Sequence, residues 1–313
     1  MKIVQVVLPI LLLVPAMIAQ EPIRVESALV NVPVIVTDQH GRFISGLKQE
    51  KFELLHDGLK EKITHFATSE DPVNIALLLD TSVSTTTVLK KIKKAAERFL
   101  LQMRPQDRAL VMTFDSKLEV LCPLSSDRRE LKEAIKNVRE GGSSTKLRDA
   151  IFQIVQKRFR SIAGRKAIVL LTDGQDHGSA TSTQELFDAI AASSTLVYPI
   201  FYRVDPIQLM EKIAEISSRL PREAVEPAWR KMEAEAAEYL ERIAELSAGR
   251  FYQSDVAQLD KAFRQISEEL RSQYLIGFYP DQSKLRGETH LLEVRVSIPD
   301  AVVRSRRSYR TSP

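Results

Sequence analysis

The spacing of hydrophobic residues divides this chain of 313 residues into three parts. From 23 to 69, apolar and polar positions alternate between turn residues, which predicts strands and a hairpin around Asp57 and Gly58. From 72 to 272, short continuous apolar runs alternate with segments whose apolar residues recur every three or four positions. From 273 to 311, strand-like patterns return. The order of the parts is therefore β, α/β, β.

The middle part is predicted to be an α/β unit with a doubly wound, mostly parallel sheet, because buried strands and amphipathic helices alternate along it. The strands are expected at 73–80, 108–115, 117–124, 166–174, 195–203 and 249–253. The helices are expected at 88–103, 128–138, 146–159, 182–193, near 206–219, near 227–247 and at 255–273.

The two flanks are each too small to bury a core alone, since isolated hairpins are marginal in water. Further strands are expected at 28–38, 274–280, 290–299 and 301–310. Two alternating apolar faces are available for packing, one of Val30, Val32, Val34 and Val36 and one of Leu292, Val294, Val296 and Ile298. We therefore expect the flanks to pair into one small β-rich domain, with the α/β unit inserted between connections near 70 and 272. The predicted segments are 1–20, 21–70, 71–272 and 273–313.

Residues 1–20 have the pattern of a secretory signal peptide, with one lysine, an apolar run and then small residues. The alternative is an uncleaved membrane anchor, but Pro9, Pro15 and the short apolar run favour cleavage near 16–20. No later apolar segment is long enough to span a bilayer. The sequence thus predicts an exported protein, secreted or periplasmic, with no transmembrane segment after cleavage.

Composition narrows the class of partner. Hydrophobic content of 44% and charged content of 27% are typical of a globular protein. The 45 basic and 41 acidic residues leave a net charge of only +4, and no basic stripe carries interleaved aromatics, which argues against a nucleic-acid partner. Cys122 is the only cysteine and is expected to be a buried apolar residue, so no intramolecular disulfide can form.

Three stretches place carboxylates or hydroxyls where ligands bind in such a sheet, beyond the carboxyl ends of its strands. They are residues 80–84 (DTSVS), 141–145 (GGSST) and 171–174 (LTDG). Each alone has an ordinary explanation as a cap, strand end or turn, but together they indicate a site for a hard divalent cation. Asp80 is expected to anchor the ion, with Ser82 and Ser84 facing it from alternate positions of an extended loop. No His or Cys cluster is evident along the chain, which disfavours zinc or copper.

The order Asp-x-Ser-x-Ser, threonine after Gly-Gly, and Thr-Asp-Gly resembles the metal-ion-dependent adhesion site (MIDAS) of von Willebrand factor A (VWA) domains over about two hundred residues. The flanks also resemble a family of secreted bacterial proteins, the VWA-related domain described from acidobacteria. The resemblance implies Mg²⁺, or alternatively Mn²⁺ or Ca²⁺, with an open position that a carboxylate of a protein partner completes. The metal ligands it implies are Asp80, Ser82, Ser84, Thr145 and Asp173.

The second stretch departs from the family pattern of Gly-Gly-Thr, three residues, then Asp-Ala. Counting back from Asp149 and Ala150 selects Thr145, whereas counting forward from the glycines selects Ser143. We favour Thr145, because the start of the following helix fixes its position. Asp149 is then expected to support the ligands or to balance the helix terminus. Asp176 and His177 are candidates for the rim, with solvated loop residues as the alternative.

Three functions remain open at this point. The favoured one is a secreted, metal-dependent adhesion or assembly module, and the second is a structural envelope module with a vestigial metal site. The third, a metal-dependent hydrolase, would need more carboxylates or histidines and a general base. The five histidines are scattered along the chain, and no hydrolase or phosphate-loop motif occurs. A non-enzymatic protein is therefore expected.

Overall fold

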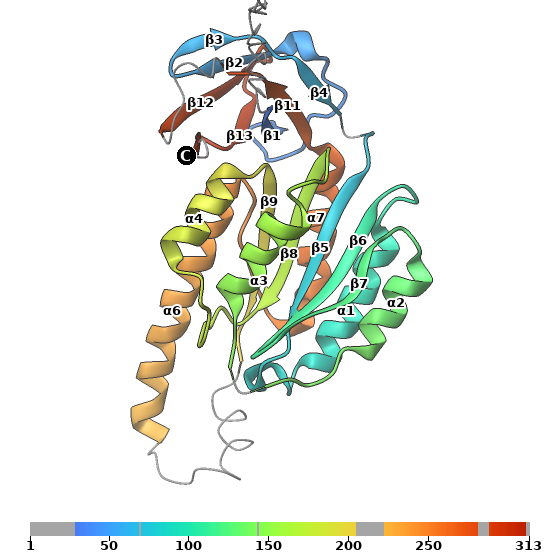
Figure 1. Cartoon of the computed structure of the whole chain (residues 1–313), viewed down its shortest axis with the longest axis vertical. Coiled ribbons are helices and arrows are strands. Elements are labelled where there is room, and N and C mark those ends of the chain that lie inside the picture. Colours follow the sequence, from blue (N-terminus) through green and yellow to red (C-terminus); the bar gives the residue numbers. More distant parts are fainter. Residues whose placement is uncertain (1–28, 69, 143, 205–221, 281–287, 311–313) are drawn as a thin grey trace, which may run out of the picture.

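The computed structural model describes residues 29–68, 70–142, 144–204, 222–280 and 288–310. They form two units stacked along the long axis, an α/β unit and a smaller β-rich unit, as Figure 1 shows. The signal peptide predicted at 1–20 and the helix predicted near 206–219 lie outside the described residues. Within the described part of the chain, no helix is both long and apolar enough to cross a membrane.

The α/β unit is built on a six-stranded sheet with the order β10-β9-β8-β5-β6-β7. Its strands are β5 (Val73–Asp80), β6 (Arg108–Phe114), β7 (Leu118–Ser125), β8 (Arg165–Thr172), β9 (Thr195–Tyr202) and β10 (Tyr252–Ser254). All neighbours run parallel except β6 and β7. The fold class predicted from the sequence, a mostly parallel doubly wound sheet, is confirmed.

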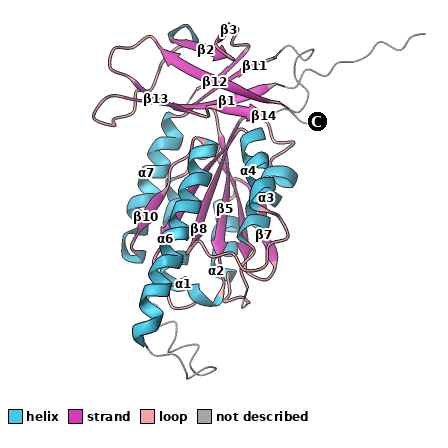
Figure 2. Ribbon diagram, turned by 90° about the vertical axis from the view of Figure 1, so that its left-hand side faces the viewer, coloured by secondary structure: helices cyan, strands magenta, loops and turns pink. Residues whose placement is uncertain are grey.

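Helices cover both faces of this sheet, as Figure 2 shows. They are α1 (Leu89–Gln102), α2 (Arg128–Asn137), α3 (Leu147–Gln153), α4 (Thr183–Ala192), α6 (Arg222–Ser247) and α7 (Leu259–Ser272). Successive residues of β5 face opposite sides, so Leu77 packs with α1, α2 and α7, and Leu78 packs with α3, α4 and α6. Because both sides are apolar, β5 is buried along its whole length.

The helix predicted at 146–159 differs from the expectation in its second half. The α-helical part ends at Gln153, and Ile154–Arg158 form a π-helical turn. Phe159 N donates to Ile154 O at 2.8 Å, a hydrogen bond between residues five apart. Phe159, directly after this wider turn, is buried in the cluster that α3, α4 and α6 form on one face of the sheet.

The flanks form two antiparallel sheets, with the orders β13-β1-β11-β4 and β14-β12-β2-β3. Their strands are β1 (Val30–Thr37), β2 (Phe52–His56), β3 (Leu59–Glu61), β4 (His65–Ala67), β11 (Tyr274–Phe278), β12 (Thr289–Val296), β13 (Val302–Ser305) and β14 (Ser308–Arg310). Each sheet combines strands from both ends of the chain, with β1 paired to β11 and β2 paired to β12. The small β-rich unit expected from the two flanks is present.

The two apolar faces identified in the sequence meet in the core of this unit. Val30, Val32, Val34 and Val36 share one buried cluster with Leu292 and Val294, and Val296 packs at its edge. Ile298 follows the end of β12 and is only half-buried.

The single strand predicted at 301–310 is in fact two strands in different sheets, β13 and β14. The break falls at Arg306, whose guanidinium is buried and donates to Ala191 O at 3.2 Å and Ser193 O at 2.9 Å. These carbonyls end α4, where a cation is favourable. The polypeptide therefore leaves one sheet, places an arginine against the α/β unit, and enters the other sheet.

Further contacts connect the two units. Glu269 of α7 is buried and pairs with Arg304 of β13, and Asp188 of α4 pairs with Arg310 of β14. The chain also crosses directly from α7 into β11. The carboxyl ends of the parallel strands lie at the opposite end of the α/β unit, away from the β-rich unit (Figure 1).

Candidate metal centre

The three polar stretches predicted to form a site meet at the carboxyl edge of the sheet. β5 and β8 are adjacent and parallel, with Leu79 opposite Leu171, so Asp80 and Thr172 end neighbouring strands. The Thr172 hydroxyl donates to Asp80 Oδ2 at 2.7 Å. The remaining stretch joins them through Gly141, whose N–H donates to Thr81 O at 2.9 Å.

The first stretch folds around the carboxylate of Asp80, which is fully buried. Asp80 Oδ1 accepts hydrogen bonds from Ser82 N at 2.9 Å and from the Ser82 hydroxyl at 2.6 Å. Val83–Thr85 form one turn of 3₁₀ helix, so Ser84 does not lie in the extended loop that we expected. The turn nevertheless brings the Ser84 hydroxyl within 3.0 Å of the Ser82 hydroxyl. Both hydroxyls are thus gathered beside one carboxylate.

The second stretch is held against the first by a close backbone approach that requires glycine. A Cβ on Gly141 would lie 1.8 Å from Asp115 Oδ2 and 2.9 Å from Thr81 O. Asp115 follows β6 and accepts from the Thr81 hydroxyl at 2.9 Å, while its carbonyl accepts from Lys146 N at 3.0 Å. Thr145 follows in a buried position and pairs with the third stretch, since His177 N donates to Thr145 O at 2.8 Å. Ser143, the alternative ligand, lies outside the described residues.

The third stretch contributes a second buried carboxylate, Asp173. Its Oδ1 accepts from Gln175 N at 3.1 Å, but its Oδ2 is buried with no hydrogen-bond partner among the described residues. Burial, and then the negative charge of Asp173, raise the pKa of Asp80 to about 8. Burial likewise raises the pKa of Asp173. Two carboxylates held together away from water are unfavourable when both are ionised, and a divalent cation would offset their charge.

The oxygen atoms at this edge fit a hard cation. Asp80, Asp173, Ser82, Ser84 and Thr145 offer only carboxylate and hydroxyl oxygens, the class of ligand that Mg²⁺ prefers. Asp173 Oδ2 is a buried acceptor that lacks a hydrogen-bond donor at normal distance among the residues the structure describes.

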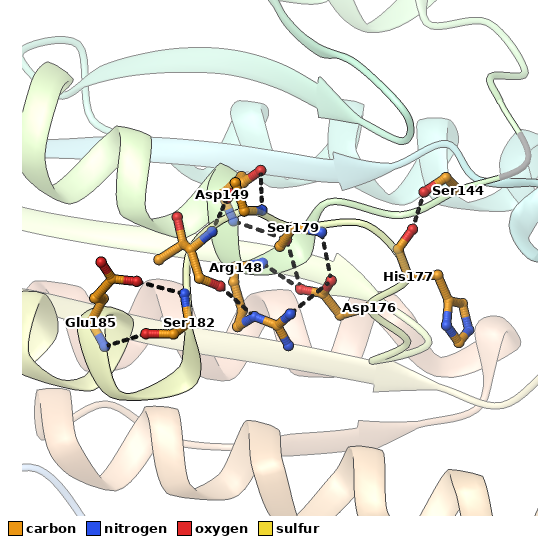
Figure 3. A network of polar contacts seen from close by, with 10 residues as sticks. Ser144, Arg148, Asp149, Asp176, His177, Ser179, Ser182 and Glu185 are labelled. Atoms are coloured by element: carbon orange, nitrogen blue, oxygen red, sulfur yellow. Dashed lines mark hydrogen bonds and ion pairs between the residues drawn. The ribbon is translucent and has the colours of Figure 1, made fainter.

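The rim candidates hold the loop that follows the third stretch onto α3, as the network in Figure 3 shows. Asp149 accepts from Ala180 N at 3.1 Å and Thr181 N at 2.8 Å, so it supports the loop. Asp176 accepts from Arg148 N and from the Ser179 hydroxyl, both at 2.8 Å. The His177 side chain is exposed, and the backbone N–H of His177 makes the hydrogen bond to Thr145 O. The helix that follows, α4, begins with a capping box formed by Ser182 and Glu185.

Sequence reasoning missed two residues that organise this edge. Thr172 belongs to the third stretch, but the sequence analysis gave it no role, and the structure shows that its hydroxyl donates to Asp80. Its position at the end of an apolar strand, directly before Asp173, was the feature of the sequence that could have indicated this role. Asp115 likewise ends a predicted strand, but the stretch around it carries no repeated pattern of hydroxyls. Its role in joining the first two loops depends on the neighbouring position of β5 and β6 in the sheet.

Comparison with known proteins shows which family the α/β unit resembles. Residues 74–228 match the family model of the von Willebrand factor type A domain. The α/β unit has the VWA fold. The match begins in β5 and ends within α6, and the same sheet and core continue through β10 and α7. None of the curated proteins matches the sequence significantly.

Solved structures similar to this chain include two bacterial proteins and one protein from the mussel byssus. BatB from Bacteroides thetaiotaomicron is 18% identical, with 63% of this chain and 97% of that chain covered and a TM-score of 0.44. The von Willebrand domain of the type V pili tip protein Mfa5 from Porphyromonas gingivalis is 13% identical, with coverages of 63% and 94% and a TM-score of 0.46. Proximal thread matrix protein 1 from the mussel byssus, with a zinc-occupied MIDAS motif, is 18% identical, with coverages of 66% and 47% and a TM-score of 0.49.

Proposed function

We propose that this protein is a metal-dependent protein-binding module for adhesion or assembly. Asp80, Ser82, Ser84, Thr145 and Asp173 hold Mg²⁺, with Mn²⁺ or Ca²⁺ as alternative ions, and the ion accepts a carboxylate from a protein partner. The observation that carries the proposal is a pair of buried carboxylates: Asp173, whose Oδ2 has no hydrogen-bond partner in the described ranges, and Asp80, whose pKa is raised to about 8.

The proposed ligand set includes Thr145 in preference to Ser143. Thr145 is buried, and its backbone is bonded to His177 in the loop that carries Asp173. The next residue, Lys146, is bonded to Asp115, which also holds the loop after Asp80. Thr145 is therefore fixed between the two carboxylate-bearing loops, which supports its assignment as a ligand.

A binding role is favoured over catalysis by the state of the neighbouring carboxyl groups. Burial raises the pKa of Asp115 and of Asp149, but the hydrogen bonds that each accepts from backbone and side-chain donors together outweigh it, so the pKa of each lies below its usual value. Such groups are poor general bases near neutral pH. The metal site also lies at the end of the molecule away from the β-rich unit, where a macromolecular partner can approach it (Figure 1). A structural module with a vestigial site is the second candidate, and it predicts no metal-dependent partner.

Partner capture tests this function. The chain without residues 1–20, immobilised and exposed to envelope extract in Mg²⁺, is expected to retain at least one protein that EDTA releases, because the ion forms the bond to the partner. Asp80→Asn should retain at least about tenfold less of that protein, whereas Glu133→Gln, at an exposed position of α2, should retain as much as the parent. Equal capture by parent and Asp80→Asn, or capture unaffected by EDTA, would contradict the proposal. A hydrolase screen with and without EDTA tests the enzyme alternative.

We also propose that the protein is exported and belongs to the acidobacterial type of VWA-related proteins, on the basis of the pattern in residues 1–20 and the two flanks. Expression of the full chain in a bacterial host is expected to give a product shortened at 16–20. Mass spectrometry of the product from the periplasm or medium measures the cleavage point, and a full-length, membrane-bound product would show an uncleaved anchor instead.

A further inference from the structure

The β-rich unit brings together two histidines that are far apart in the sequence. His56 ends β2, and His290 lies in β12, which pairs with β2 so that His56 is opposite Leu292. The centroids of the two imidazole rings are 5.2 Å apart. The sequence suggested that no histidine cluster exists, and this expectation was wrong because the pairing of the two flanks creates one.

Asp57 completes the cluster from the turn after β2. Its backbone is in the left-handed region (φ 49°), and it exchanges two hydrogen bonds with Leu291, one of them from Leu291 N to Asp57 Oδ1 at 2.8 Å. One carboxylate oxygen is thereby fixed to the neighbouring strand. The other, Oδ2, lies 2.8 Å from His290 Nδ1 and 3.5 Å from His56 Nε2.

These distances suit a tetrahedral metal site. His56, Asp57 and His290 can each offer one ligand atom such that all three atoms lie within 4.8 Å of one another. Zinc bonds of about 2.0–2.1 Å place neighbouring ligand atoms roughly 3.3 Å apart in a tetrahedron. The two separations to Asp57 Oδ2, 2.8 and 3.5 Å, fall on either side of that value.

The ligand atoms joined by these distances are Asp57 Oδ2, His290 Nδ1 and His56 Nε2. His290 is 5% exposed, and its ring is held by the hydrogen bond between its Nδ1 and Asp57 Oδ2. A cation bound by the three atoms would replace that hydrogen bond, and it could enter from the side of Asp57, whose side chain is 46% exposed.

The donor set selects a different class of ion from that of the VWA edge. Two imidazoles and one carboxylate are typical of zinc and related transition metals, whereas Mg²⁺ prefers oxygen ligands alone. The hydroxyl of Tyr309, in β14, lies 3.0 Å from His56 Nε2, and this hydrogen bond would be replaced by the bond from His56 to the ion.

We propose that His56, Asp57 and His290 bind a zinc-class transition metal that joins the N-terminal and C-terminal flanks. The site is independent of the metal centre of the VWA domain, and the two lie in different units of the fold. The ion would connect side chains 233 residues apart in sequence, His290 and Asp57. Because a crosslink over a long loop removes many unfolded conformations, its expected effect is to stabilise the β-rich unit from which the α/β unit is inserted.

Titration with Zn²⁺ and Co²⁺ tests this site. The protein is the chain without residues 1–20 and without an affinity tag, carrying Asp80→Asn so that the VWA edge does not bind. One equivalent of Zn²⁺ is expected by calorimetry, and Co²⁺ should give the absorption bands of a tetrahedral nitrogen and oxygen site. His290→Ala and Asp57→Asn should each weaken Zn²⁺ binding about 100-fold or more, since each removes a ligand. His40→Ala, which removes an exposed histidine, should bind like the parent.

The variants are chosen so that a folding defect cannot be mistaken for loss of a ligand. Asp57→Asn keeps an oxygen that can accept from Leu291 N, and circular dichroism should show unchanged secondary structure. No Zn²⁺ binding by the Asp80→Asn parent at micromolar metal would overturn the proposal. Retention of parent-like affinity in folded Asp57→Asn and His290→Ala would overturn it equally, and neither result bears on the Mg²⁺ site.

Discussion

Replacing Arg304 with alanine is expected to lower the free energy of unfolding by about 3 kcal/mol, because it removes the principal partner of a buried carboxylate. The Glu269 side chain is 1% exposed, and its Oε1 accepts from the Arg304 guanidinium. Its other oxygen lies 3.3 Å from Arg250 Nε and accepts no hydrogen bond within the part of the chain that the structure describes. Without Arg304, Glu269 loses its shorter ion pair and keeps the longer one with Arg250.

The comparison that isolates this effect is Arg307→Ala. Arg307 lies three residues further along the same segment but is exposed, so its replacement should change stability by no more than about 0.5 kcal/mol. Urea unfolding, followed by fluorescence and by circular dichroism, measures both variants. The double variant Glu269→Leu with Arg304→Met should recover most of the loss, since an apolar pair leaves no buried charge. Equal stability of Arg304→Ala and Arg307→Ala would show that the contact contributes nothing.

This contact also gives α7 a direct connection to the β-rich unit. The second connection between the two units runs directly from α7 into β11, so the last helix of the α/β unit lies next to the β-rich unit. The structure adds the side chains that make the connection, since Glu269 of α7 meets Arg304 of β13. A shift of α7 on ligand binding would therefore act on a buried ion pair in the β-rich unit.

The strands and helices of the α/β unit were predictable because the apolar residues that each element buries recur at regular spacing within the element itself. The apolar run at 73–80 is buried on both faces of the sheet, and the apolar stripe of 88–103 faces the core from α1. The end of α3 was not predictable, because a change from α- to π-helical hydrogen bonding leaves the apolar period nearly unchanged. Local patterns thus identified the elements better than their ends.

Features that depend on contacts between distant segments were not readable from the sequence. The strand predicted at 301–310 breaks at Arg306, because that arginine reaches the end of α4 in the other unit. His56 and His290 meet only because β2 and β12 pair in one particular register. In the same way, Thr172 and Asp115 act on the candidate metal site through neighbouring strands, which the order of motifs alone does not specify.

Replacing Asp80 with asparagine is expected to abolish Mg²⁺ binding while leaving the protein folded. Asparagine keeps an oxygen that can accept from Ser82 or Thr172, but it lacks the charge that attracts the ion. At about 100 times its Kd, Mg²⁺ should raise the free energy of unfolding of the parent by about 2.7 kcal/mol and that of the variant by nothing measurable. In EDTA near pH 8, the variant should be at least as stable as the parent, because it no longer buries an ionisable carboxyl.

The ionisation of Asp80 should make the affinity for Mg²⁺ depend on pH. Its pKa is raised to about 8 in the folded chain, so below that pH the carboxyl is largely protonated and Mg²⁺ must displace the proton. A raised carboxyl pKa also means that the contribution of Asp80 to the stability of the metal-free protein falls as the pH rises from its ordinary pKa of 3.8 to about 8. Mg²⁺ should therefore bind more weakly near pH 6 than near pH 8.

The most direct test is calorimetric titration of Mg²⁺ into the metal-stripped chain without residues 1–20, at about pH 6 and pH 8 and in two buffers of different ionisation enthalpy. Asp57→Asn serves as the background, so that the histidine cluster does not contribute. The account predicts one equivalent of bound Mg²⁺, tighter binding at the higher pH with release of a proton, and no binding after Asp80→Asn. Equal Mg²⁺ binding with and without Asp80→Asn, or no binding at millimolar Mg²⁺ at either pH, would contradict it.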